Sequence, residues 1–347
     1  MMIVRKAAVL VAGSWGTALA AVLADHGADV TIWTRRAEQA EEINRLRTNR
    51  KFLPETVLPE RIAATTSIAS ALSGAGTVLL AAPTSAMREV ARLARPHLPD
   101  GCDVIHVAKG FEAVSLKRMT EVIAEELPQI DPGRIVVLSG PSHAEEVIRR
   151  CPTTVVVAAG RLEAAERAQD LLINSYFRVY TNPDVVGVEV AGALKNIIAL
   201  GAGLSDGLGF GDNAKAALVT RGLAEIARLG VAMGANPLTF SGLAGVGDLV
   251  VTCTSRHSRN WRAGYMLGQG KRLEDVLREM GMVVEGVKTT QAAYALSRRY
   301  GVSMPITEQL HAVLFAGKSP LDAVRELMGR GRAREIEETF GDHGQKS

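Results

Sequence analysis

The chain has 347 residues, of which 47% are hydrophobic, and its net charge is only +3, from 40 basic and 37 acidic side chains. A chain of this length is too long for one ordinary hydrophobic core, so we expect two domains. The near balance of charge argues against a nucleic-acid-binding protein.

Cysteine and histidine usage and hydropathy exclude further classes of protein. The three cysteines, Cys102, Cys151 and Cys253, have no metal or redox spacing, which indicates a reducing compartment. The seven histidines are scattered and no carboxylates cluster with them, so we expect no metal site. We find no signal peptide and no apolar run near about 18 residues, so we expect a cytoplasmic protein with no membrane insertion.

The N-terminal part of the sequence predicts a dinucleotide-binding turn. Residues 7–11 form an apolar run of strand length, 12–16 a turn with two glycines, 17–26 a helix rich in Ala and Leu, and 29–33 a second apolar run. This order is the setting in which a dinucleotide fingerprint is credible, because the N–H groups at the helix start can hold a pyrophosphate. A tight βα turn in an unrelated α/β protein is the alternative.

Val11 departs from the fingerprint. The pattern G-x-G-x-x-G would place a glycine at this position. Glycine allows a turn with unusual backbone angles, which a β-branched residue such as valine resists. We expect Val11 to keep extended, strand-like angles, with the turn made at Ala12 and Gly13. A displaced loop that binds the cofactor poorly is the alternative.

The end of the second strand indicates which dinucleotide is bound. A carboxylate there would bind the ribose 2′-hydroxyl of NAD, but the residues that follow Trp33 and Thr34 are Arg35 and Arg36. Two guanidinium groups suit a 2′-phosphate, which they can bind through charge-assisted hydrogen bonds. A solvated basic turn is the alternative.

Apolar runs alternate with helix-length segments through the first half of the chain. Four further strands are expected, at 77–82, 103–108, 134–138 and 153–159. The alternation predicts a doubly wound, mostly parallel α/β sheet of Rossmann type. Ligands of such sheets bind at the carboxyl ends of the strands, where Lys109 and Ser142 suit a phosphate or a carbonyl.

The pattern changes at 182–184, and the residues after this point indicate helix and loop. We therefore expect a dinucleotide-binding domain over 1–184, an all-helical C-terminal domain over 185–330 and a charged, flexible tail over 331–347. The later helices are expected at 213–233, 261–268, 273–280, 287–300, 307–315 and 320–328. The glycine-rich segment before them has no preceding strand, and we interpret it as a hinge and a helix start capped by Asp212.

One predicted helix, over 190–205, has a single charged side chain, Lys195. On a helix, Gly192, Asn196 and Gly203 share a face with this lysine. Small neighbours allow close approach to the backbone and apolar surroundings exclude water, so Lys195 can exchange a proton in a sheltered site. A lysine with a buried stem and an ammonium group in solvent is the alternative.

The segment 192–203 resembles the signature of NAD(P)-dependent glycerol-3-phosphate dehydrogenase of the bacterial biosynthetic type. Other segments resemble motifs of that family in the same order, namely 12–20, 109–110, 140–142, 211–218, 220–223, 245–249 and 258–260. The resemblance implies reversible reduction of dihydroxyacetone phosphate to sn-glycerol 3-phosphate with NADP(H) or NAD(H), which supplies the phospholipid backbone. It also implies that the helical domain binds the substrate.

The resemblance further implies roles for single residues. Lys195 matches the catalytic lysine, the proton donor in reduction and the acceptor in oxidation, and it also binds the substrate. The other substrate-binding residues would be Lys109, Gly140, Ser142, Asp248, Ser258, Arg259 and Asn260. The cofactor-binding residues would be Gly13, Ser14, Trp15, Gly16, Arg35, Arg36, Lys109, Ala144, Arg259, Val283 and Glu285.

Two other functions are weighed against this one. A β-hydroxyacid dehydrogenase or a ketopantoate-type reductase would share the fold and a catalytic lysine, but would not account for 258–260 following Asp248. A non-catalytic dinucleotide-binding protein would fit Val11, although Lys109 and Lys195 argue against it. The preference between the two cofactors, feedback by product and the oligomeric state stay open, a homodimer being one option.

Overall fold

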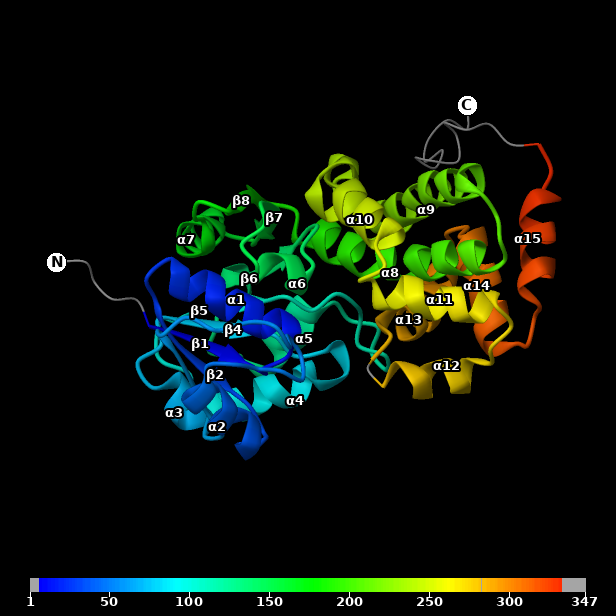
Figure 1. Cartoon of the computed structure of the whole chain (residues 1–347). Helices are drawn as coiled ribbons and strands as arrows, with labels where there is room; N and C mark the ends of the chain where they lie inside the picture. The colour runs from blue at the N-terminus through cyan, green and yellow to red at the C-terminus, as the bar shows by residue number, and fades with distance from the viewer. Residues whose placement is uncertain (1–5, 282, 333–347) are drawn as a thin grey trace, which may run out of the picture. The chain divides into compact units, whose positions relative to one another are not determined.

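The computed structural model describes residues 6–281 and 283–332. These residues form two compact units, shown in Figure 1. Unit 1 consists of residues 6–109 and 117–185, and unit 2 of residues 110–116 and 186–332. Most of the predicted tail, from residue 333 onward, lies outside the described residues.

Unit 1 contains an eight-stranded sheet in the order β3-β2-β1-β4-β5-β6-β7-β8. Its strands are β1 (Lys6–Leu10), β2 (Asp29–Trp33), β3 (Ile62–Thr65), β4 (Thr77–Leu80), β5 (Asp103–His106), β6 (Ile135–Ser139), β7 (Thr153–Ala158) and β8 (Phe177–Asn182). Neighbouring strands are parallel except at β6–β7. The predicted doubly wound, mostly parallel sheet is therefore confirmed. The two edge strands, β3 and β8, were not predicted, because edge strands need no continuous apolar run.

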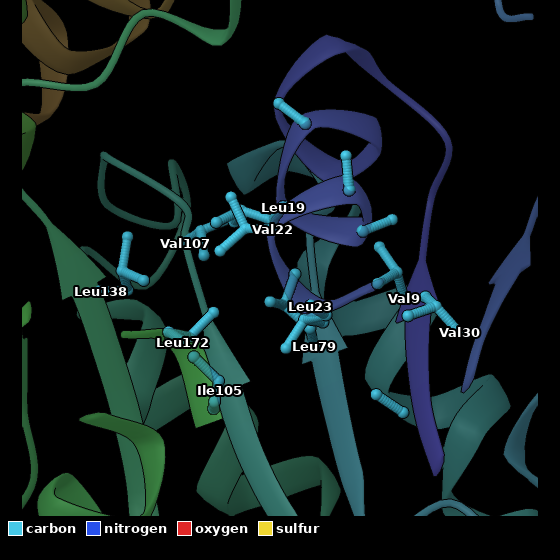
Figure 2. Packing of buried hydrophobic residues seen from close by; sticks show 14 of the residues in the cluster. Val9, Leu19, Val22, Leu23, Val30, Leu79, Ile105, Val107, Leu138 and Leu172 are labelled. Atoms are coloured by element: carbon cyan, nitrogen blue, oxygen red, sulfur yellow. The ribbon is translucent and has the colours of Figure 1, made fainter. Parts of the chain in front are cut away.

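Helices cover both faces of this sheet. They are α1 (Ser14–Asp25), α2 (Ala37–Leu46), α3 (Ile68–Leu72), α4 (Thr84–Ala94), α5 (Met119–Glu126), α6 (Ala144–Val147) and α7 (Leu162–Leu172). Side chains along a strand alternate between the faces, so Val9 belongs to the buried cluster that includes α1 and α7, while Leu10 belongs to the one that includes α3, α4 and α5. Figure 2 shows Leu23 of α1 against Leu79 of β4, and Leu19 and Val22 of α1 near Val107. Each such buried side chain stabilises the fold by about 1.5–3 kcal/mol.

The turn after β1 lies where the order of the strands reverses. On one side β1 pairs with β2, and on the other side with β4, both in parallel. In open α/β sheets this position, at the carboxyl ends of the strands, is where ligands bind. The loops after β2, β5 and β6 leave the sheet at the same edge, because these strands run parallel to β1.

The expectation that Val11 keeps extended backbone angles is wrong, because its φ is +85°. Its N–H still continues the sheet by donating to the carbonyl of Trp33 at 3.0 Å. Its carbonyl turns toward the start of α1, where Gly16 lies so close that an added Cβ would collide with this oxygen. The chain thus leaves the strand within one residue, through the positive φ of Val11. Val11 is strained, as a β-branched residue at positive φ must be.

From residue 186 onward, the regular elements in the described part of unit 2 are all helices. After α8 (Val185–Gly207) come α9 (Asp212–Ala232), η3 (Pro237–Ser241), η4 (Leu243–Gly247), α10 (Asp248–Thr254), α11 (Arg259–Gly268), α12 (Leu273–Met280), α13 (Glu285–Tyr300), α14 (Pro305–Phe315) and α15 (Pro320–Met328). The six predicted later helices correspond to α9 and α11 to α15 and agree with them to within two residues, whereas η3, η4 and α10 were not predicted. Asp212 is not the cap of α9, because Gly211 occupies the N-cap position and Asp212 already belongs to the helix.

Helix α8 is the central element of unit 2. It is apolar enough and long enough to cross a membrane, with a mean hydropathy of 1.6, but 89% of that stretch is buried in the protein. The expectation that the chain lacks such an apolar run is therefore wrong: α8 is a buried core helix. Gly203 of α8 and Gly264 of α11 let the two backbones touch, since a Cβ on either would collide with the other helix. The small residues of α8 near Lys195 thus allow α11 to pack closely against this helix.

Candidate active site

Lys195, on the buried middle part of α8, forms an ion pair with Asp248, the first residue of α10. The two side chains are 7% and 1% exposed. The ammonium group also donates to the hydroxyl of Thr252 at 2.8 Å, and that hydroxyl donates to the carbonyl of Asp248 at 2.6 Å. The ammonium group is thus held by a carboxylate and a hydroxyl in a buried place, and the alternative of an ammonium group in solvent is wrong.

A second polar group stands beside this pair. The amide of Asn260, on α11, donates to the side-chain oxygen of Asn196 at 2.8 Å and accepts from the backbone N–H of Gly286 at 2.8 Å. Gly286 must lack a side chain, because a Cβ there would lie 2.6 Å from the carbonyl oxygen of Asn196. Asn196 follows Lys195 directly, so α11 and α13 are fixed next to the ion pair.

The other residues predicted in unit 2 differ in exposure. Ser258 is buried and caps α11, with its hydroxyl accepting from the N–H of Trp261 at 3.2 Å. Arg259, the next residue, is exposed. Val283 is also exposed, whereas Glu285 is half-buried at the start of α13. The described contacts therefore join Lys195 to Asp248 and Asn196 to Asn260, but they do not link these residues to Val283.

The turn after β1 presents the start of α1 without a cap of its own. Gly13 is the N-cap residue, no side chain bonds to the first turn, and that turn has no acidic residue. Its N–H groups are therefore available to an anion. Space above Gly13 is open, since an added Cβ would meet no atom within 4 Å. The indole N–H of Trp15 is buried and has no hydrogen-bond partner among the described residues. Unpartnered donors and an open approach fit a pyrophosphate.

Arg35 and Arg36 follow β2 at the same edge of the sheet. Arg35 is exposed and forms an ion pair with Glu89 at 2.8 Å. Arg36 donates to the side-chain oxygen of Gln39 at 3.1 Å and lies over the ring of Phe52. An exposed ion pair contributes little to stability, so a phosphate could replace Glu89 as the partner of Arg35.

The loops after β5 and β6 hold three more of the predicted residues. Lys109 donates to the carbonyl of Gly140 at 3.1 Å, and the hydroxyl of Ser142 donates to the same oxygen at 2.9 Å. Gly140 has a φ of +123°, which a side chain would oppose, and a Cβ there would lie 3.1 Å from the backbone of Val155. Ala144 is buried as the first residue of α6. Lys109, Gly140 and Ser142 thus form one cluster within unit 1.

Sequence reasoning missed Thr252 and the part played by Asn196. Thr252 stands four residues after Asp248, one turn along α10, and that spacing could have indicated a shared helix face. Asn196 was placed on the face of Lys195, but its partner Asn260 is distant in sequence. A cavity of about 320 Å³ in unit 2, between α8, α9, α14 and α15, contains none of the predicted site residues.

Comparisons with known proteins show the family of this chain. Residues 6–165 match the family described as NAD-dependent glycerol-3-phosphate dehydrogenase N-terminus, and residues 184–325 match its C-terminus. The chain belongs to this family.

Relatives within the family align along almost all of the chain. The glycerol-3-phosphate dehydrogenase [NAD(P)+] of Lysinibacillus sphaericus is 61% identical over 96% of this chain and 99% of its own length. That of Bacillus subtilis is 59% identical over 96% of this chain and 97% of its own. The crystal structure of glycerol-3-phosphate dehydrogenase from Coxiella burnetii is 38% identical with a TM-score of 0.89, covering 94% of this chain and 99% of that one. Membership in this family decides against a β-hydroxyacid or ketopantoate-type reductase.

Proposed function

We propose that this chain reduces dihydroxyacetone phosphate to sn-glycerol 3-phosphate with NADPH or NADH, reversibly, and that Lys195 is the proton donor and acceptor. Family membership supports the reaction. The observation that carries the role of Lys195 is its buried ammonium group, held by Asp248 and Thr252. A buried, fixed ammonium group is suited to general acid catalysis, since it is excluded from water and oriented by its partners.

The reaction needs one proton at the C2 oxygen for each hydride delivered to C2. The bound nicotinamide supplies the hydride. Lys195 stabilises the negative charge that grows on the carbonyl oxygen and transfers its proton there, which leaves an amine beside Asp248. In the reverse direction the amine takes the proton from the hydroxyl of glycerol 3-phosphate. Asp248 and Thr252 orient Lys195 in both directions.

Unit 1 would hold the dinucleotide at the turn after β1. The uncapped start of α1, with Gly13, Ser14, Trp15 and Gly16, offers N–H donors to the pyrophosphate. Arg35 and Arg36 would bind the adenosine end, including a 2′-phosphate. Further contacts of the cofactor would come from Lys109, Ala144, Arg259, Val283 and Glu285.

The remaining roles rest on the resemblance to family motifs. Lys109, Gly140 and Ser142 in unit 1 and Asp248, Ser258, Arg259 and Asn260 in unit 2 would contact the substrate, with the cationic groups serving its phosphate. Unit 1 would be the dinucleotide-binding domain and unit 2 the substrate-binding domain. We further propose a cytoplasmic enzyme that supplies glycerophospholipid synthesis, which agrees with its three free thiols.

The test follows NADPH oxidation at 340 nm with dihydroxyacetone phosphate as the substrate. We expect turnover that depends on both compounds, and glycerol 3-phosphate as the product. Ketopantoate serves as the control substrate and should give no turnover. Turnover of ketopantoate in place of dihydroxyacetone phosphate, or of neither compound, would contradict the proposal.

A further inference from the structure

The turn after β1 is held from behind by two buried amide side chains. The carbonyl of Ala12, which follows the strained Val11, accepts a hydrogen bond from the Gln39 amide at 2.7 Å and one from the Asn49 amide at 3.1 Å. Gln39 is on α2, whereas Asn49 is in the loop after it. The two are 7% and 1% exposed. Segments 27 and 37 residues away thus fix one carbonyl of the turn.

The two amides form one continuous network with their neighbours. Gln39 donates to Asn49 at 2.9 Å, and Asn49 donates to the hydroxyl of Thr17 on α1 at 2.8 Å. The side-chain oxygen of Gln39 accepts from the hydroxyl of Thr34 at 2.6 Å. Both N–H bonds of each amide therefore have an acceptor within the network, which fixes the orientation of both side chains.

This network opposes the preference of Val11. Left to local sterics, a β-branched residue adopts extended angles, and the turn would then leave the sheet in another direction. A glycine at this position would adopt the observed angles without strain. The structure instead keeps φ at +85° beside a carbonyl bonded by two amides. Hydrogen bonds from distant residues thus stabilise a positive φ that a glycine at this position would adopt without help.

We propose that Gln39 and Asn49 are positioning residues for the dinucleotide, because they hold the carbonyl of Ala12 and so keep the strained turn in its binding shape. This inference rests on the proposed location of the pyrophosphate at the start of α1. The two amides touch the turn from the protein interior, and they act on the cofactor through the backbone alone.

Gln39 has a further contact that Asn49 lacks. Its side-chain oxygen accepts from the guanidinium group of Arg36 at 3.1 Å. One amide therefore joins the pyrophosphate turn to an arginine proposed for the 2′-phosphate. Loss of Asn49 should weaken NADPH and NADH equally, because both share the pyrophosphate. Loss of Gln39 should weaken NADPH more than NADH, because only NADPH uses the arginine.

The central experiment compares Asn49→Ala in the natural chain and in a chain that carries Val11→Gly. Dissociation constants for NADPH and NADH are measured by calorimetric titration of the full chain. In the natural chain we expect Asn49→Ala to raise both constants about tenfold. In the Val11→Gly chain the rise should be less than about threefold, because glycine adopts the angles of the turn without strain that the amide must offset. An equal rise in both chains would mean that Asn49 only stabilises the fold and would overturn the proposal.

Asn44→Ala is the matched control. Asn44 is also on α2, and its amide bonds to the backbone N–H and carbonyl of Ala64 in β3, at 2.7 and 2.9 Å, rather than to the turn. We expect it to lower the melting temperature without changing either dissociation constant. If Asn49→Ala does not fold, Asn49→Ser, which keeps one donor, replaces it in the same comparison.

Two more variants separate this inference from the proposed function. Gly16→Ala should abolish binding of both dinucleotides, because its Cβ would collide with the carbonyl of Val11. Unchanged binding would refute the location of the cofactor, whereas lost binding together with an unaffected Asn49→Ala would refute only the positioning role. Gln39→Ala should raise the NADPH constant at least about threefold more than the NADH constant. An equal rise would contradict the link to Arg36.

Discussion

Lys195 of α8 and Asp248 of α10 form a buried ion pair in which a lysine proposed for catalysis is also part of the core of unit 2. Removal of one partner of a buried pair leaves an unpaired charge, which costs about 3–5 kcal/mol. Stability and the proposed catalytic role therefore rest on the same two side chains, and a single substitution cannot separate them. Paired substitutions can.

We expect Lys195→Met to lower kcat by at least about 10²-fold, because it removes the general acid, and also to lower the melting temperature. The double variant Lys195→Met, Asp248→Asn should recover the melting temperature, because no charge stays unpaired, but not kcat. Steady-state assays and thermal melts of both variants test this. Lys318→Met, which breaks the ion pair between Lys318 and Glu326 of α15, is the control with unchanged kcat. Activity restored by the double variant would remove Lys195 from the mechanism.

The two arginines after β2 should determine how well NADPH competes with NADH. Replacement of Arg35 and Arg36 by alanine should raise KM for NADPH about tenfold or more and change KM for NADH little, because only NADPH carries a 2′-phosphate. The measurement is KM for each cofactor at saturating substrate. Arg45→Ala, an exposed arginine on α2 paired with Glu41, should leave both values unchanged. An equal rise of both KM values would mean that the arginines attract anions without selecting the phosphate.

Because Val11 is strained, we expect Val11→Gly to be more stable than Val11→Ala, the reverse of the usual order of these two substitutions. Both Val11→Gly and Val11→Ala lose the valine side chain, but only glycine relieves the positive φ. The glycine variant should therefore be more stable than the alanine variant by about 1–2 kcal/mol. At an extended residue the alanine variant would be the more stable by about 0.5–1 kcal/mol. Urea unfolding of both variants decides the sign, and a more stable alanine variant would contradict the left-handed conformation.

Glu225 of α9 predicts a pH dependence of stability. Its buried carboxylate accepts from the N–H of Ile306 at 2.6 Å and from that of Thr307 at 3.1 Å, at the start of α14. Burial raises the pKa of Glu225 to about 7, from an ordinary value of 4.5. The folded protein then binds this proton more tightly than the unfolded chain, so the contribution of Glu225 to stability falls as pH rises from 4.5 to about 7.

Thermal melts between pH 5 and pH 8 of the natural chain and of Glu225→Gln test this. Relative to the variant, which cannot titrate here, the natural chain should be more stable at the acidic end than at the alkaline end. Glu326→Gln, an exposed carboxylate on α15 whose pKa is lowered by Lys318, should give a constant difference over this range. A constant difference for Glu225→Gln as well would refute the raised pKa.

Several features followed from the sequence because they depend on local pattern. The strands β1, β2, β4, β5, β6 and β7 are apolar runs because a parallel sheet buries both of its faces. Helix α9 and the helices α11 to α15 follow from helical periodicity and from Gly and Pro at their ends, whereas the short α10 was not predicted. The motif of α8 indicated a sheltered lysine for the same reason, since one charge among apolar and small residues is a local signal.

Only the tertiary structure decided how distant residues constrain one another. Lys195 bonds to Asp248, which is 53 residues away in the sequence, and Asn49 bonds to the carbonyl of Ala12, which is 37 residues away. Local pattern contains no information about such pairs, because they depend on how separate elements pack. Val11 shows the consequence most clearly. Its own steric preference predicts extended angles, but the sheet bond to Trp33, the approach of Gly16 and the two amides on the next carbonyl together outweigh that preference.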